Sequence, residues 1–133
     1  MSKWLNTMQP LGALLMRLVL GASMAVHGYQ KVVPHGALHH YAYATIPALG
    51  LPYWLGYVSA FTELVGGAFL ILGLLTRLAA ALIAINMLVA FFTVGIHQGF
   101  GIYNYILALA SIAIMLLFYG AGALGLDRKF GLS

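Results

Sequence analysis

One acidic residue lies in the middle of a long apolar stretch, where its chemistry would be unusual. Glu63 is the only charged residue in the run from Tyr53 to Leu75. A carboxylate at the centre of a bilayer costs about 3 kcal/mol, so it should face other helices rather than lipid. Stepping by three and four residues from Glu63 picks out mostly small or polar residues, which suit contacts between helices. Glu63 is therefore the first candidate catalytic residue.

Arg17 is the second candidate catalytic residue, because it is a buried cation within reach of Glu63 by a simple estimate of depth. At 1.5 Å per residue from the expected helix ends, Arg17 lies about 9 Å deep, Asn86 about 14 Å and Glu63 about 18 Å. We expect an Arg17–Glu63 ion pair, with Asn86 hydrogen-bonded to one of the two. The pair could be a purely structural polar contact that fixes helix register, a proton-accepting or ligand-contacting site, or a contact with a partner subunit.

Histidines gather toward the other end of the expected helices. His27 and His97 end two of the apolar stretches, and three more histidines lie in the loop after the first. The candidate ligand-binding residues are His27, Lys31, Asn86, His97 and Tyr103. Further side chains expected around this end are His35, His39, His40, Tyr29, Tyr41, Tyr43 and Asn104.

Several ligands are compatible with this set of histidine, lysine and tyrosine. A quinone headgroup or a similar small polar ligand suits it best. A metal ion fits less well, because no carboxylate is available there to orient the ligands and the spacings match no metal signature. Haem between His27 and His97 is equally unfavoured, and we predict no metal site. The plainest alternative is that these side chains reach the lipid headgroups at the membrane interface.

The composition is that of an integral membrane protein. Of the 133 residues, 63% are hydrophobic and 6% are charged, and the mean hydropathy is +1.00. A soluble domain carries about 25% charged residues. The net charge of +4 comes from six Lys and Arg, too few for a nucleic-acid surface. The absence of cysteine excludes disulfides, thiol chemistry and thiolate metal sites within this chain.

Four apolar stretches predict an all-α fold, an antiparallel four-helix membrane bundle forming a single domain over residues 1–133. The expected spans are residues 11–29, 53–75, 78–96 and 102–119. We expect residues 36–45 to form a short interfacial helix between the first two spans. A cleaved signal peptide is disfavoured because Arg17 interrupts the first apolar run. We expect helix contacts at Gly21, Gly28, Gly66, Gly67 and Arg77.

The basic residues predict an orientation. Lys3, Arg77, Arg128 and Lys129 fall on one side of the expected bundle, whereas Lys31 is alone on the other. By the positive-inside rule both termini should be cytoplasmic, in a multi-pass protein of the inner (plasma) membrane.

The chain resembles the DoxX family of small membrane proteins over nearly its whole length. The resemblance rests on four segments, which are LLMRLVLGASMAVHGYQKV (14–32), ALGLP (48–52), ELVGGAFLILGLLTRLAA (63–80) and GAGALGLDR (120–128). It implies a four-helix inner-membrane protein, and it carries over Arg17, His27, Lys31, Glu63 and Arg77. Some members are the membrane part of a thiosulfate:quinone oxidoreductase, and others associate with enzymes of oxidative or thiol stress. The remaining four histidines lie outside the family pattern.

Three functions remain open on the sequence. The chain could be a membrane subunit of a quinone-linked oxidoreductase or redox-stress complex, with Glu63 and Arg17 handling protons and the region of His27 and Lys31 contacting quinone. It could instead be a non-enzymatic scaffold or assembly factor for a partner protein, or a small oligomeric transporter. The expected partners are the lipid bilayer and either a partner subunit or further copies of the chain, and no nucleic acid. A redox role would require an external electron carrier or a partner subunit.

Overall fold

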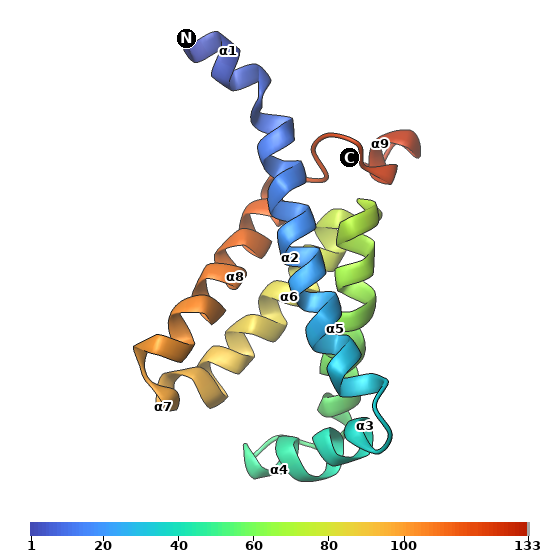
Figure 1. The fold of residues 1–133 in the computed structure, drawn as a ribbon, viewed down its shortest axis with the longest axis vertical. Coiled ribbons are helices and arrows are strands. Elements are labelled where there is room, and N and C mark those ends of the chain that lie inside the picture. Colours follow the sequence, from blue (N-terminus) through green and yellow to red (C-terminus); the bar gives the residue numbers. More distant parts are fainter. Residues whose placement is uncertain (133) are drawn as a thin grey trace.

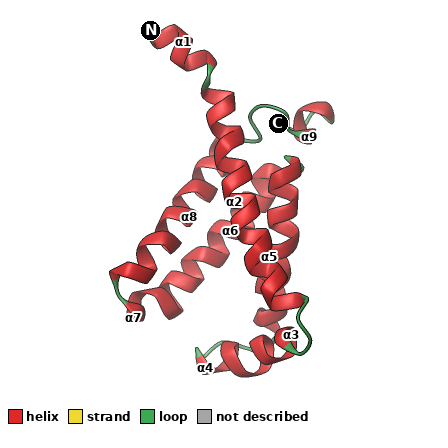
Figure 2. Ribbon diagram, viewed as in Figure 1, coloured by secondary structure: helices red, strands yellow, loops and turns green. Residues whose placement is uncertain are grey.

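The computed structural model describes residues 1–132, and that part of the chain contains helices and no β-strand (Figure 2). Its long helices are α2 (Gln9–Val32), α5 (Trp54–Leu72), α6 (Thr76–Ala90) and α8 (Phe100–Tyr119). Helix α6 continues through a π-helical segment, η2 (Phe91–Gly95), into α7 (Ile96–Gln98). In the described residues, four helical segments are long and apolar enough to cross a membrane, and they overlap the four expected spans.

Shorter helices flank these segments. Helix α1 (Ser2–Thr7) precedes α2, and α9 (Leu126–Lys129) lies near the C-terminus. Between α2 and α5, the elements α3 (Ala37–His40), η1 (Tyr41–Thr45) and α4 (Ile46–Ala48) follow one another directly. Ala42 and Ile46 are buried in this segment, whereas His39 and His40 are exposed. The segment is therefore amphipathic, and it packs through its apolar face against the first turn of α5, where Gly56 meets Ala42.

Glycines bring the backbones of α2 and α5 into direct contact. A Cβ atom on Gly21 would lie 2.8 Å from the carbonyl oxygen of Gly67, and a Cβ on Gly67 would lie 2.5 Å from the Ala25 nitrogen. A Cβ on Gly28 would overlap the backbone of Leu64. Small residues permit such close approach, which increases dispersion contacts between helices in lipid. The contacts also fix the register of α2 against α5, because Gly21 lies opposite Gly67 and Gly28 lies opposite Leu64.

The helices form two pairs that separate toward one end of the molecule. Helix α2 packs mainly on α5, and α6 packs mainly on α8. The pairs meet near the tight connection between α5 and α6 and diverge away from it (Figure 1). Buried side chains of all four helices fill the space between them, and the largest apolar ones are Leu20, Met24, Leu70, Ile83 and Leu116.

Polar contacts close the end at which α5 connects to α6. The Asp127 carboxylate accepts hydrogen bonds from the backbone nitrogens of Leu75 (2.6 Å) and Thr76 (2.8 Å), and so caps the first turn of α6. Arg77 donates hydrogen bonds to the carbonyls of Leu117 (3.0 Å) and Phe118 (2.7 Å) in the last turn of α8. Both contacts satisfy backbone groups that a helix end leaves unpaired.

Candidate functional site

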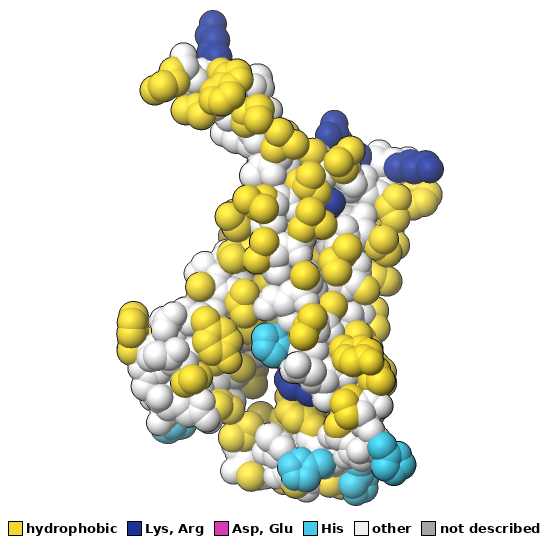
Figure 3. Space-filling model, in the orientation of Figure 1, with side chains coloured by type: hydrophobic (Ala, Val, Ile, Leu, Met, Phe, Trp, Pro, Cys, Tyr) yellow, Lys and Arg dark blue, Asp and Glu magenta, His cyan; other side chains and the backbone are white. Residues whose placement is uncertain are grey.

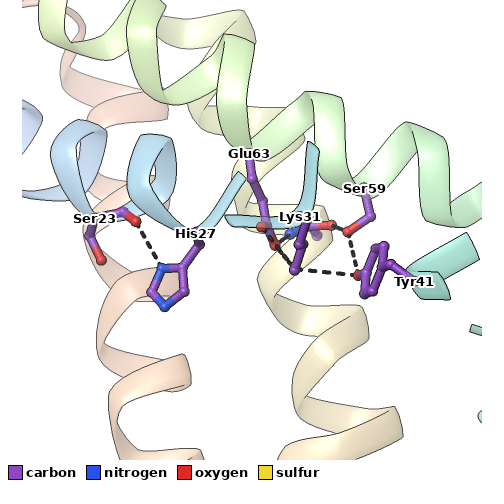
Figure 4. A network of polar contacts seen from close by, with 7 residues as sticks. Ser23, His27, Lys31, Tyr41, Ser59 and Glu63 are labelled. Carbon is purple, nitrogen blue, oxygen red and sulfur yellow. Dashed lines mark hydrogen bonds and ion pairs between the residues drawn. The ribbon is translucent and has the colours of Figure 1, made fainter. Parts of the chain in front are cut away.

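The described residues contain one ion pair between side chains, and it joins α2 to α5. Lys31 Nζ lies 2.9 Å from Glu63 Oε1 and 2.8 Å from Oε2 (Figure 4). The side chain of Lys31 is 27% exposed, whereas that of Glu63 is 4% exposed. A buried carboxylate is tolerable when it is paired and hydrogen-bonded. Lys31 and Asn86, whose Nδ2 donates to Oε1 at 3.0 Å, supply those bonds.

The polar network continues to Tyr41, and its hydrogen bonds run in one direction. Ser59 Oγ donates to the Asn86 side-chain oxygen at 2.6 Å. Because a hydroxyl has one proton, the Tyr41 hydroxyl must donate to Ser59 Oγ, 3.1 Å away. Lys31 in turn donates to the Tyr41 oxygen at 3.4 Å. This last bond is long, so the third N–H of Lys31 is the least committed donor in the network.

Four separate elements supply these side chains. Lys31 lies in the last turn of α2, Tyr41 begins η1, and Asn86 comes from α6. Ser59 and Glu63 are four residues apart in α5, so both project from the same face of that helix. Isolated π-helical turns are frequent at functional sites, and the two π-helical segments found in residues 1–132, η1 and η2, contribute residues to the cavity beside the network.

The network forms part of the wall of a cavity of about 360 Å³ between the diverging helix pairs. The volume is within the range of small-molecule sites, roughly 300–1,000 Å³. Figure 3 shows a hollow on one face of the molecule at this level. Most of the lining is aliphatic, and it includes Leu55, Val58, Leu82, Ile85, Ile106 and Leu109. The cavity therefore combines an apolar lining with a few convergent polar groups, as ligand sites usually do.

His27 lines the same cavity, and its tautomer is fixed by a neighbouring carbonyl. Its Nδ1 lies 2.8 Å from the carbonyl oxygen of Ser23, one turn earlier in α2. A carbonyl can only accept, so Nδ1 carries the proton and donates it. In neutral His27, Nε2 is then a hydrogen-bond acceptor, and it makes no hydrogen bond within residues 1–132. Figure 4 shows the ring with Nδ1 toward Ser23 and the other nitrogen directed away from it.

The expected Arg17–Glu63 ion pair is wrong, because Glu63 pairs with Lys31 instead. The depth estimate took the helix ends to be level, but the start of α2 projects beyond the ends of the other long helices (Figure 1). The glycine contacts set Gly28 against Leu64, so Lys31 reaches Glu63. Arg17 lies against Gly73, about 15 Å farther along α5 at 1.5 Å per residue. Asn86 was expected to hydrogen-bond either Arg17 or Glu63, and it bonds Glu63.

Arg17 belongs to the closed end of the molecule rather than to the cavity. Arg17 is 1% exposed, and its guanidinium donates to the Ala121 carbonyl at 2.8 Å. It lies between Gly73 and Gly125, at both of which a Cβ atom would meet the guanidinium. The position explains why these two sites are glycine, and it separates Arg17 from the network around Glu63.

The remaining candidates divide between the cavity and the surface. His27, Lys31 and Asn86 line the cavity together with Glu63. His97 and Tyr103 do not line it. His97 is exposed, and the Tyr103 ring packs edge-on against Phe91 and Phe100. The exposed residues of the segment after α2 include His35, His39, His40 and Tyr43.

The sequence did not single out three residues that matter in the structure. Ser59, the serine of the network, was not named as a candidate, although its spacing of four from Glu63 places it on the same helix face. Tyr41 was one of many aromatic candidates. Asp127 had no assigned role, because nothing in its neighbours along the chain indicates that it caps α6.

Comparison with known proteins identifies the family of the chain. The model of the DoxX family matches residues 12–96, which include Lys31, Glu63 and Asn86. The chain belongs to the DoxX family. A Bacillus subtilis (strain 168) protein named "Putative oxidoreductase CatD" is 32% identical over 127 residues, which cover 92% of this chain and 90% of that protein. No solved structure matches the chain. This DoxX protein is thus a multi-pass membrane protein. One of its relatives is named as a putative oxidoreductase.

Proposed function

We propose that this DoxX protein is a membrane subunit of a quinone-linked oxidoreductase, and that its cavity binds the quinone ring. The observation that carries the proposal is the Lys31–Glu63 ion pair in the wall of an apolar cavity of about 360 Å³. A flat ring with polar oxygens at its edge suits apolar walls with few polar groups. The oxidoreductase name of the B. subtilis relative supports the same class of reaction.

The polar groups offer both a donor and an acceptor to such a ring. The weakly committed N–H of Lys31 can donate to a quinone carbonyl, and Nε2 of His27 can accept from the hydroxyl of the reduced form. Reduction of the ring takes up two electrons and two protons. The electrons come from a partner redox protein and the two protons from water at the loop side of the cavity, to which the Tyr41–Ser59–Asn86 hydrogen bonds connect the Glu63 carboxylate. Arg17 has no part in this proposal, because it lies at the closed end.

We also propose that the helices form an antiparallel bundle in the inner membrane, with both termini in the cytoplasm. Lys and Arg side chains gather at the end of the molecule that holds α1 and α9, and histidines gather toward the opposite end (Figure 3). This distribution agrees with the positive-inside rule. The segment from α3 to α4 would then lie at the outer interface, with exposed histidines facing the headgroups and Ala42 and Ile46 facing the bundle.

A second function, anchoring a partner protein, is favoured by the shape of the N-terminal region. Helix α1 and the first turns of α2 extend beyond the other helices (Figure 1), and Leu11 and Leu15 are exposed there. A partner subunit or a second copy of the chain could cover these side chains. The two functions are compatible if the anchored partner is the electron donor.

The test of the first function is to purify the protein from its native membranes and to extract and quantify bound quinone. We expect about one quinone per protein and no Soret band in the visible spectrum. His27→Phe should reduce the content of quinol, the reduced form kept under reducing conditions, at least about fivefold, because the phenyl ring offers no acceptor to its hydroxyl. Val26→Phe is the matched control, since Val26 is an exposed neighbour in α2 that does not line the cavity. A wild-type protein without quinone, or with a stoichiometric partner and no quinone, would refute the proposal.

A further inference from the structure

Part of the cavity lining reaches the outer surface of the helices between α5 and α6. Four of its lining residues are also exposed there, namely Val58 (52%), Leu82 (46%), Ile85 (60%) and Val89 (43%). Leu82, Ile85 and Val89 follow one another at spacings of three and four, so they form one stripe on α6. All four side chains are aliphatic. We call this set the lateral opening.

The lateral opening exists because α5 and α6 diverge. Near their connection the two helices are close, and Gly66 of α5 contacts the Ile83 side chain of α6. Farther from the connection, α6 follows α8 while α5 follows α2 (Figure 1). At this level the Asn86 side chain of α6 reaches Ser59 and Glu63 of α5, and the cavity lies beside these hydrogen bonds. It leads from the outer surface to Asn86 and Glu63, which lie on the inner side of the same two helices.

The two ends of the cavity therefore differ in chemistry. The inner end carries the Lys31–Glu63 pair and its hydrogen bonds. The lateral opening carries only aliphatic side chains, and it lies within helical segments that are apolar enough to span a bilayer. A bilayer at this depth offers hydrocarbon rather than water. A polar molecule would gain nothing by passing through such an opening, whereas an alkyl chain could occupy it without losing its apolar surroundings.

We infer that the ligand of this cavity is amphiphilic: its polar ring lies against the Lys31–Glu63 pair, and a hydrocarbon tail leaves through the lateral opening into the lipid. The ligand enters sideways from the bilayer by the same route. The inference rests on the proposed function for the identity of the ring, and it adds that the tail is part of what is recognised. Residues Val58 and Ile85 set the width of the opening from α5 and α6.

The experiment compares two quinones that share a dimethoxy-methyl-benzoquinone ring, one with a decyl chain and one without. Detergent-solubilised protein is incubated with each, and native mass spectrometry gives the fraction of protein that carries the ligand. Wild type should bind the decyl form at least about tenfold more tightly, since several methylene groups become buried. Ile85→Trp narrows the opening and should remove this preference, which is read as the ratio of the two affinities measured on the same variant.

Two further variants complete the design. Leu88→Trp adds the same indole to α6 at an exposed position outside the cavity lining, and it should behave as wild type. Val58→Trp narrows the opening from the α5 side and should also remove the preference for the decyl form. It provides the same readout if Ile85→Trp folds poorly.

The outcomes separate the inference from the proposed function. Equal binding of both quinones by wild type, or an unchanged preference in Ile85→Trp and Val58→Trp, overturns the lateral opening and leaves quinone binding intact. Failure of wild type to bind either quinone overturns both, as does a retained phospholipid that neither quinone displaces.

Discussion

Lys31 Nζ lies within 2.9 Å of both carboxylate oxygens of Glu63, and the two residues come from different helices at the edge of one cavity. Two of the three Lys31 donors are directed at Glu63, and the carboxylate takes a third bond from Asn86. Breaking such a pair by removing one partner leaves an uncompensated buried charge. The stability of the α2–α5 contact therefore depends on both residues together.

Glu63→Gln should lower the free energy of unfolding by about 3 kcal/mol, because the Lys31 ammonium loses its counter-charge. The double variant Lys31→Met/Glu63→Leu should recover at least half of that loss, since two apolar side chains replace the buried charges. Unfolding of the detergent-solubilised proteins, followed by circular dichroism, measures both changes. A double variant as unstable as Glu63→Gln would mean that the pair is not the source of the effect.

A double-mutant cycle distinguishes the two possible cations. Arg17→Met and Glu63→Gln should be additive to within about 0.5 kcal/mol, because the two sites share no partner. Lys31→Met and Glu63→Gln should deviate from additivity by more than about 1 kcal/mol. The same unfolding measurement serves for all variants. Strong coupling of Arg17 to Glu63, with none for Lys31, would show that the register of α2 against α5 is different.

Asp127→Ala should destabilise the fold by about 1–2 kcal/mol, because the backbone nitrogens of Leu75 and Thr76 lose their acceptors. Arg128→Ala removes a charge from the adjacent, exposed position and should change the free energy of unfolding by less than about 0.5 kcal/mol. Hydrogen exchange at the first turn of α6 gives a local readout. Equal protection of that turn in Asp127→Ala and wild type would argue against the cap.

Gly28→Ala should destabilise the α2–α5 contact by about 1–3 kcal/mol, because the added methyl group would overlap the Leu64 backbone. Gly12→Ala is the control in the same helix. A Cβ atom there meets nothing within 4 Å, and alanine is the better helix former by about 1 kcal/mol. Gly12→Ala should therefore be neutral or stabilising in the same unfolding assay, and a similar loss in both variants would exclude close packing as the cause.

The sequence determined the features that depend on local composition. Stretches of apolar residues long enough to cross a bilayer specified the helical segments, since backbone groups in lipid must be paired within the helix. The cost of a charge in hydrocarbon was enough to predict that Glu63 is buried, as is observed. The small residues of α2 and α5 likewise indicated where helices could approach closely.

Only the tertiary structure decided which polar groups meet. The partner of Glu63 depends on the axial offset of α2 relative to α5, and an offset of a few turns moves a contact by many ångströms. That offset follows from how Gly21, Gly28 and Gly67 interlock across the two helices, which no local pattern records. The same holds for Asp127, which caps a helix that begins far away in the chain, and for the cavity, which exists because α5 and α6 pack on different partners and diverge.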